Sequence, residues 1–179
     1  MRSLLQRTLR RLLVISGVVT ACLGASTSSC DFGSGSDGIG PSFVTELTLR
    51  DVNGVPSDSF ARGEPIELRL TVRNRLSTAA TVQFTSTRQS DFVVIRRGSQ
   101  ALVWKFSDGK AFAQVQTELE FAAGEIKTFS VTWDQLDSSE QPVDTGVYEA
   151  RGVLIYEGFD TDPLRSHEMG STLERFTIQ

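Results

Sequence analysis

The sequence predicts an all-β fold, an immunoglobulin-like antiparallel β-sandwich of about eight or nine strands. Short apolar runs that alternate with a period of two recur between residues 43 and 178. Turn sequences containing Gly or Asp separate these runs, and no helical periodicity persists from Ser42 onwards. A closed barrel is the alternative arrangement of the same strands.

The clearest strand covers residues 66–73, where aliphatic side chains from Ile66 to Val72 alternate with polar ones. This alternation is typical of a strand with one face in the core and the other in solvent. Residues 92–96 form a more continuous apolar run, which predicts a strand covered on both faces. The other expected strands are residues 43–50, 81–87, 101–106, 115–121, 126–133, 147–156 and 173–178.

Composition and charge narrow the classes of function. The chain has 179 residues, 39% of them hydrophobic, which is enough to form the core of one domain. Its net charge is −4, but four arginines and no acidic residue precede Cys22. The rest of the chain carries 14 basic against 22 acidic residues, a net charge of −8. A surface of that sign repels phosphate backbones, so we expect no nucleic-acid partner.

The N-terminal segment predicts an exported bacterial lipoprotein. Residues 1–11 carry four arginines, and residues 12–19 are mostly apolar but too few to span a bilayer. Residues 19–22, Val-Thr-Ala-Cys, resemble the lipobox of bacterial lipoproteins. We therefore expect a signal peptide over residues 1–21, a lipid on Cys22, and a location at the cell membrane or envelope.

Two alternatives to this lipid site are lipidation of Cys30 and cleavage after Ala25 without any lipid. Residues 22–41 are rich in Ser and Gly, a composition that favours a flexible tether. The folded domain is then expected over residues 42–179.

A series of motifs follows in one order through the centre of the chain and combines turn glycines, aromatic residues and strand ends. They are Asn74, Gln83-Phe84-Thr85-Ser86, Asp91-Phe92-Val93-Val94, Val103-Trp104-Lys105-Phe106-Ser107, Phe112-Ala113-Gln114, Ala123-Gly124-Glu125, Thr132-Trp133-Asp134 and Thr145-Gly146-Val147-Tyr148. Over about residues 66–156 the series resembles the intracellular proteinase inhibitor family (BsuPI-type domain). Ser90 departs from the aromatic residue expected there, and residues 142–145 are less rich in proline than the family pattern.

The resemblance implies a β-sandwich that binds a protein partner, with a proteinase as the partner that the family name suggests. Combined with the N-terminal segment, it predicts a membrane-anchored extracytoplasmic protein-binding domain that is a proteinase inhibitor. The family name implies an intracellular protein, whereas the N-terminal segment predicts export. The alternative function is a non-inhibitory structural or scaffolding module of the cell envelope.

A proteinase inhibitor needs a rigid, exposed loop that enters the proteinase cleft as a substrate does. Two polar turns are candidates for this contact. The first consists of Ser107, Asp108, Gly109 and Lys110, in which the Asp-Gly pair readily adopts positive φ. The second lies within residues 137–145 and includes Asp137, Ser138, Ser139 and Glu140.

Five further residues are interpreted mainly as structural. Tyr148 follows a glycine near the start of a late strand, which predicts a tyrosine corner with the hydroxyl bonded to backbone. Trp104 and Trp133 are expected in the core or on a sheet face, with sugar or peptide binding as the alternative. Asp91 and Asp134 are expected to accept backbone hydrogen bonds at strand ends and not to act as an acid–base pair.

No arrangement of residues indicates catalysis, so we do not expect an enzyme. His167 is the only histidine, and no Ser or Cys nucleophile pattern accompanies it. Its neighbours Asp160, Asp162 and Glu168 lack the spacing of a calcium loop and are expected in solvent. There is no zinc spacing and no phosphate-binding loop, so we expect no metal, cofactor or small-molecule substrate.

Overall fold

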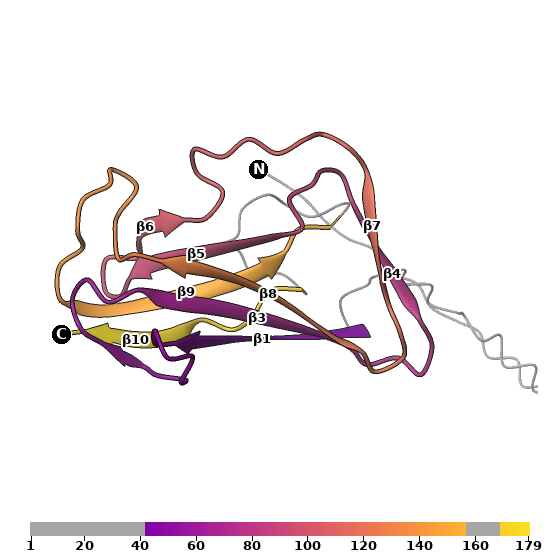
Figure 1. The fold of residues 1–179 in the computed structure, drawn as a ribbon, viewed down its shortest axis with the longest axis horizontal. Coiled ribbons are helices and arrows are strands. Elements are labelled where there is room, and N and C mark those ends of the chain that lie inside the picture. The colour runs from indigo at the N-terminus through magenta and orange to yellow at the C-terminus, as the bar shows by residue number, and fades with distance from the viewer. Residues whose placement is uncertain (1–41, 157–168) are drawn as a thin grey trace, which may run out of the picture. The chain divides into compact units, whose positions relative to one another are not determined.

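The computed structural model describes residues 42–156 and 169–179, and these residues form a β-sandwich (Figure 1). The predicted all-β fold is confirmed, and the described ranges contain no helix long and apolar enough to cross a bilayer. The strands are β1 (Phe43–Arg50), β2 (Ser59–Phe60), β3 (Ile66–Asn74), β4 (Ala80–Phe84), β5 (Ser90–Arg96), β6 (Ala101–Lys105), β7 (Thr117–Phe121), β8 (Ile126–Trp133), β9 (Gly146–Leu154) and β10 (Glu174–Ile178).

Two sheets form the layers of the sandwich. One has three strands in the order β1-β3-β8, and the other has five in the order β2-β10-β9-β5-β6. Neighbouring strands are antiparallel except β2 and β10, which are parallel. Because β1 and β3 contact β9 across the core, the strands β6 and β8 are edges on one side of the sandwich, and β1 and β10 lie towards the other.

The predicted strands agree with the observed ones apart from their ends and one omission. The missed strand β2 has two residues, too few for an alternating pattern, yet Phe60 is buried and pairs with Ile178. Strand β4 ends at Phe84 and not at Thr87, since the amide of Thr87 leaves the ladder to bond the carbonyl of Ala113. Boundaries of this kind depend on contacts that are distant in sequence.

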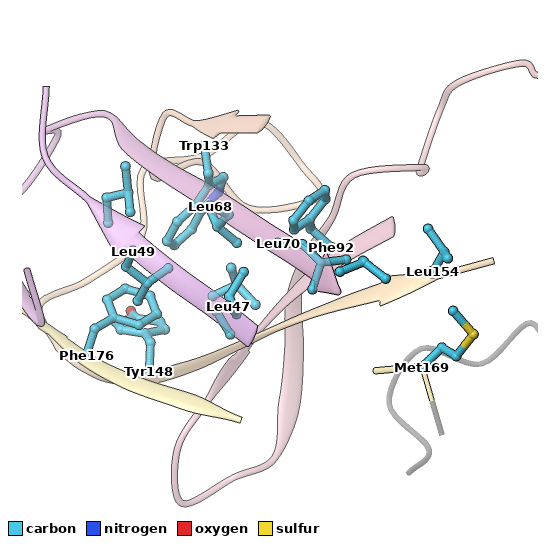
Figure 2. Packing of buried hydrophobic residues seen from close by; sticks show 14 of the residues in the cluster. Leu47, Leu49, Leu68, Leu70, Phe92, Trp133, Tyr148, Leu154, Met169 and Phe176 are labelled. Atoms are coloured by element: carbon cyan, nitrogen blue, oxygen red, sulfur yellow. The ribbon is translucent and has the colours of Figure 1, made fainter. Parts of the chain in front are cut away.

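Burial follows the alternation of the sequence. The aliphatic side chains of β3 from Ile66 to Val72 are fully buried, while β5 is buried on both faces from Asp91 to Ile95, as its continuous apolar run predicts. Figure 2 shows the leucines of β1 and β3 packed towards the aromatic side chains of the opposite sheet. Trp133 of β8 packs in the core against Tyr148 and Phe176 of the opposite sheet, and the centroids of these three rings are 5.7–6.4 Å apart.

The β3–β8 pair bends at one end and continues as the separate pair β4–β7, which turns away from the direction of the sandwich (Figure 1). The fully buried Asn74 holds this bend. Its amide nitrogen donates to the carbonyls of Thr78, Ala122 and Phe121, and its side-chain oxygen accepts from the amide of Leu76. A single side chain therefore joins the connection after β3 to the end of β7 and to the turn that follows it.

Candidate functional site

A groove of about 410 Å³ opens on the side of the sandwich where β6 and β8 are the edge strands. Its floor contains Trp104, Val131 and Trp133. One wall is the turn after β6, and the other is the loop after β8. The two loops singled out in the sequence, residues 107–110 and 137–140, are thus brought together although they are far apart along the chain.

The two tryptophans of the floor differ in environment. Their ring centroids lie 6.1 Å apart, and Trp133 is only 1% exposed, with its indole nitrogen donating to the carbonyl of Leu136 at 2.7 Å. Trp104 is half-buried and lines the groove. Trp133 is therefore a core residue as predicted, while Trp104 offers aromatic surface to a ligand.

The first wall, the turn after β6, is held in position by Asp91, a residue of β5 whose carboxylate is fully buried in the core. Asp91 accepts hydrogen bonds from the amide of Ser107 at 3.1 Å and from its hydroxyl at 2.8 Å. The guanidinium of Arg88 lies 3.3 Å from the same carboxylate and balances its charge. The prediction that Asp91 accepts hydrogen bonds at a strand end is confirmed, and its role is to set the position of the turn. Gly109 adopts the positive φ of 70° that the Asp-Gly pair predicted.

The second wall is fixed by Gln135, which the sequence analysis missed. Its side chain is nearly fully buried and contacts residues 61–64, the loop before β3. The amide nitrogen donates to the carbonyls of Ala61 and Glu64 at 2.8 Å each, and the side-chain oxygen accepts from the amide of Gly63 at 2.7 Å. Nothing in the sequence marks a lone glutamine in a polar loop as an anchor, because its partners lie about 70 residues away.

The tip of the second wall is a closed turn. The carboxylate of Asp137 accepts from the amides of Ser139 at 2.8 Å and Gln141 at 3.0 Å, and Glu140 has a φ of 61°. The amide of Ser138 donates to the carbonyl of Val103 and thereby attaches the tip to β6. The tip is exposed, but its amides are already bonded within the turn or, for Ser138, to β6, so its backbone differs from an extended, substrate-like segment.

The base of the second wall contains the predicted tyrosine corner. The hydroxyl of the buried Tyr148 donates to the carbonyl of Asp144 at 2.5 Å, four residues upstream. The guanidinium of Arg96 lies over the tyrosine ring, 5.6 Å from its centroid. Burial raises the pKa of the Tyr148 hydroxyl above its ordinary value of 10.0, so it remains a hydrogen-bond donor.

The rim of the groove is charged. Four carboxylates, those of Asp108, Asp134, Asp137 and Glu140, line it together with two ammonium groups. Asp134 accepts no hydrogen bond from the described residues and is exposed, so the expectation that it accepts backbone hydrogen bonds is wrong. It lies beyond the last paired residue of β8, where its side chain points to solvent.

Volume alone does not distinguish this groove. A second groove of about 420 Å³ lies between β1 and β10 on the other side of the sandwich. It is lined by Leu47, Leu49, Pro56 and charged side chains, has no aromatic residue, and includes neither candidate loop. The aromatic floor and the two loops, and not the size, single out the groove at β6 and β8.

Several expected features lie outside the described residues. They are the signal peptide, the tether, Cys22, Cys30, Ala25, Asp160, Asp162, His167 and Glu168. In the part of the chain that the structure does describe, no three His, Cys, Asp or Glu side chains gather in a way that could hold a metal ion.

Residues 55–158 match the sequence profile of a family described as intracellular proteinase inhibitor, BsuPI. The chain belongs to this family. The BsuPI match includes both walls of the groove and begins earlier than the resemblance at residue 66 suggested. No match was found among curated proteins.

Membership of the BsuPI family overturns the expected localisation. The N-terminal segment predicts an exported, lipid-anchored protein, but the family is described as intracellular, which points to a cytoplasmic location. The prediction of a location at the cell membrane or envelope is therefore wrong. It depended on the basic and apolar composition of residues 1–19 and on the lipobox-like residues 19–22, all of which precede the BsuPI match.

The solved structures to which this chain is similar share little sequence with it. The alkylpurine DNA glycosylase AlkC of Pseudomonas fluorescens is 9% identical, with a TM-score of 0.43, over 77% of this chain and 30% of that one. The CARDB domain of a Pyrococcus furiosus protein is 12% identical, with a TM-score of 0.40, over 76% and 91%. The C-terminal domain of Wzt is 9% identical, with a TM-score of 0.46, over 77% and 74%. This chain thus spans less than a third of AlkC.

Proposed function

We propose that residues 42–179 form one protein-binding domain that inhibits a proteinase without catalytic activity of its own. The observation that carries this proposal is the convergence of two loops, selected separately from the sequence, on opposite walls of one groove. The description of the BsuPI family as proteinase inhibitors supports the same function.

The walls suit a contact that changes little on binding. Asp91 and Gln135 fix their bases, and Asp137 fixes the tip, so little conformational entropy is lost when a partner binds. Because the tip is a closed turn, the domain would act as a rigid wedge beside the proteinase cleft and not as an extended substrate mimic. Trp104 is the expected anchor, since partly exposed aromatic side chains dominate many interfaces.

The direct experiment measures inhibition of a panel of proteinases from the serine, cysteine, aspartic and metallo classes by the full chain. We expect inhibition of at least one of them at about micromolar concentration or below. Failure against every class would overturn the inhibitory function. Binding to a proteinase without any effect on its activity would also overturn it and leave a non-inhibitory interaction module.

Two matched variants locate the contact. Ser139→Arg adds a bulky cation at the exposed tip of the second wall, whereas Thr48→Arg adds the same group in the groove between β1 and β10. We expect Ser139→Arg to weaken inhibition by about tenfold or more, since a clash at the centre of an interface is costly. Thr48→Arg should leave inhibition unchanged, and the reverse result would place the contact on the other side of the sandwich.

A further inference from the structure

The chemistry of the groove at β6 and β8 is specific. Its carboxylates surround an aromatic floor, and those of Asp108, Asp134 and Glu140 form no ion pair or hydrogen bond with any residue in the described ranges. Lys105 and Lys110 are the basic residues of its lining. The rim therefore has an excess of negative charge next to an indole ring, a combination that attracts cations.

One cation already lies over an aromatic ring next to this groove. The ammonium group of Lys110 lies 3.6 Å from the centroid of the Phe106 ring, and Phe106 packs edge-on against Trp104 with centroids 6.5 Å apart. This contact holds the ammonium group of Lys110 at Phe106, and no carboxylate in the described ranges forms an ion pair with it. The first wall thus already contains a contact between a cation and an aromatic ring, the same kind of contact that Trp104 could make with a ligand.

We infer that the groove binds a basic side chain, lysine or arginine, of the protein partner, with the cation over Trp104 and between the carboxylates of the two walls. This inference rests on the proposed protein-binding function and adds the chemistry of the partner residue. Attraction between a cation and an indole ring strengthens when the pair is shielded from water, which the closed turn at Asp137 would provide.

The edges of the two sheets favour insertion of a side chain over addition of a strand. On β6 the carbonyl of Val103 is already bonded by the amide of Ser138. At the end of β8 opposite the groove, Lys127 points inward, where its ammonium group bonds Glu125 and lies 5.4 Å from the buried ring of Phe121. An inward-pointing charge on an edge strand opposes pairing with another strand. Both features favour contact of the partner with the space between the edges over addition of a strand to either edge.

The test uses the full chain and two short peptides, acetyl-Gly-Ser-Arg-Ser-Gly-amide and the same peptide with citrulline in place of arginine. Citrulline has nearly the same shape as arginine but carries no charge. Because the chain has only two tryptophans, their indole resonances in proton–nitrogen NMR spectra report directly on the floor of the groove. We expect the arginine peptide to shift the Trp104 resonance and to bind about tenfold more tightly than the citrulline peptide.

Charge variants provide the second arm of the test. Asp134→Asn combined with Glu140→Gln removes two rim carboxylates and should weaken binding of the arginine peptide about fivefold. Glu118→Gln combined with Glu120→Gln removes two exposed carboxylates from β7, outside the groove, and should have no effect.

Lys110→Met removes the resident cation and should tighten binding about threefold, since like charges in one groove repel. Equal affinity for the arginine and citrulline peptides would overturn the inference, and so would equal loss in the rim and β7 double variants. If the wild-type chain inhibits a proteinase and the rim double variant inhibits it equally, the inference fails while the proposed function stands. If the arginine peptide binds at Trp104 but no proteinase is inhibited, the proposed function fails and the groove chemistry stands.

Discussion

The two walls of the groove are held in different ways. The turn after β6 depends on one buried charge, the carboxylate of Asp91, which bonds both the amide and the hydroxyl of Ser107. The loop after β8 depends on several separate groups, namely Gln135 at its base, Asp137 at its tip and Tyr148 at its end. A single buried side chain thus holds the first wall, whereas three side chains spaced along the chain hold the second wall.

This difference determines how each wall responds to damage. Removing one member of a buried ion pair leaves the other charge buried without a partner. The desolvation cost of that remaining charge is then no longer offset. Neutral hydrogen bonds such as those of Gln135 and Tyr148 contribute less each than bonds to a buried charge, and those at the exposed tip can in part be replaced by water. We therefore expect one substitution to disable the first wall, whereas the second wall loses stability in small steps.

The largest effect is expected for Asp91→Ala. The substitution leaves the largely buried Arg88 without its counter-ion and Ser107 without its acceptors, so the free energy of unfolding should fall by about 3–5 kcal/mol. Urea denaturation followed by tryptophan fluorescence measures this change. Asp91→Asn keeps an acceptor for Ser107 and should cost less. A loss below about 1 kcal/mol for Asp91→Ala would show that the first wall has other anchors.

Gln135→Ala is expected to have the next largest effect. It removes three hydrogen bonds to the loop of residues 61–64, and the free energy of unfolding should fall by about 1–3 kcal/mol. Hydrogen exchange should accelerate at the amide of Gly63 and in the loop after β8, while the amide of Ser107 stays protected. Faster exchange on both walls would contradict the idea that they are anchored independently.

The outline of the fold could be predicted from the sequence because it depends on local alternation. The strand from Ile66 to Val72 and the turn at Gly109 follow from patterns within a few residues. The tyrosine corner at Tyr148 was likewise predictable, since its acceptor lies only four residues away.

The composition of the site could be predicted only in part. Both loops were recognisable as exposed turns, but their meeting at one groove depends on β6 and β8 being edges of different sheets, which no local pattern specifies. Gln135 and Asn74 were not recognised as anchors, because their backbone partners are distant or lie in bends without sequence signatures. Alternation places Trp104 on a face of β6, but it does not indicate that the edge of the sandwich leaves this indole accessible.

Tyr148→Phe tests one of the three side chains that hold the second wall and should cost about 1 kcal/mol, the usual contribution of one hydrogen bond. Because burial raises the pKa of Tyr148 in the folded state, its protonated form is favoured by folding. This contribution is complete below the pKa of the unfolded tyrosine, about 10, and is lost as the pH rises above that value. Wild-type stability should therefore decline more steeply than that of Tyr148→Phe in alkaline buffer. Parallel pH profiles would mean that the hydroxyl is not linked to folding.

The smallest effect on stability is expected for Asp137→Ala. The two amides that its carboxylate bonds, those of Ser139 and Gln141, are in exposed residues where water can replace the carboxylate, so the cost should be about 0.5–1 kcal/mol.

The effect on function should be larger, since the tip would lose its fixed turn and bind a partner only after ordering. Asp137→Asn separates shape from charge, because its side-chain oxygen preserves the turn while the negative charge is removed. If the turn is what a proteinase contacts, inhibition falls strongly in the alanine variant and only a little in the asparagine variant, which keeps the turn but lacks one of the four rim carboxylates. Equal inhibition by the wild-type chain and Asp137→Ala would show instead that the rigidity of the tip has no part in binding, and that only the bases of the walls need to be fixed.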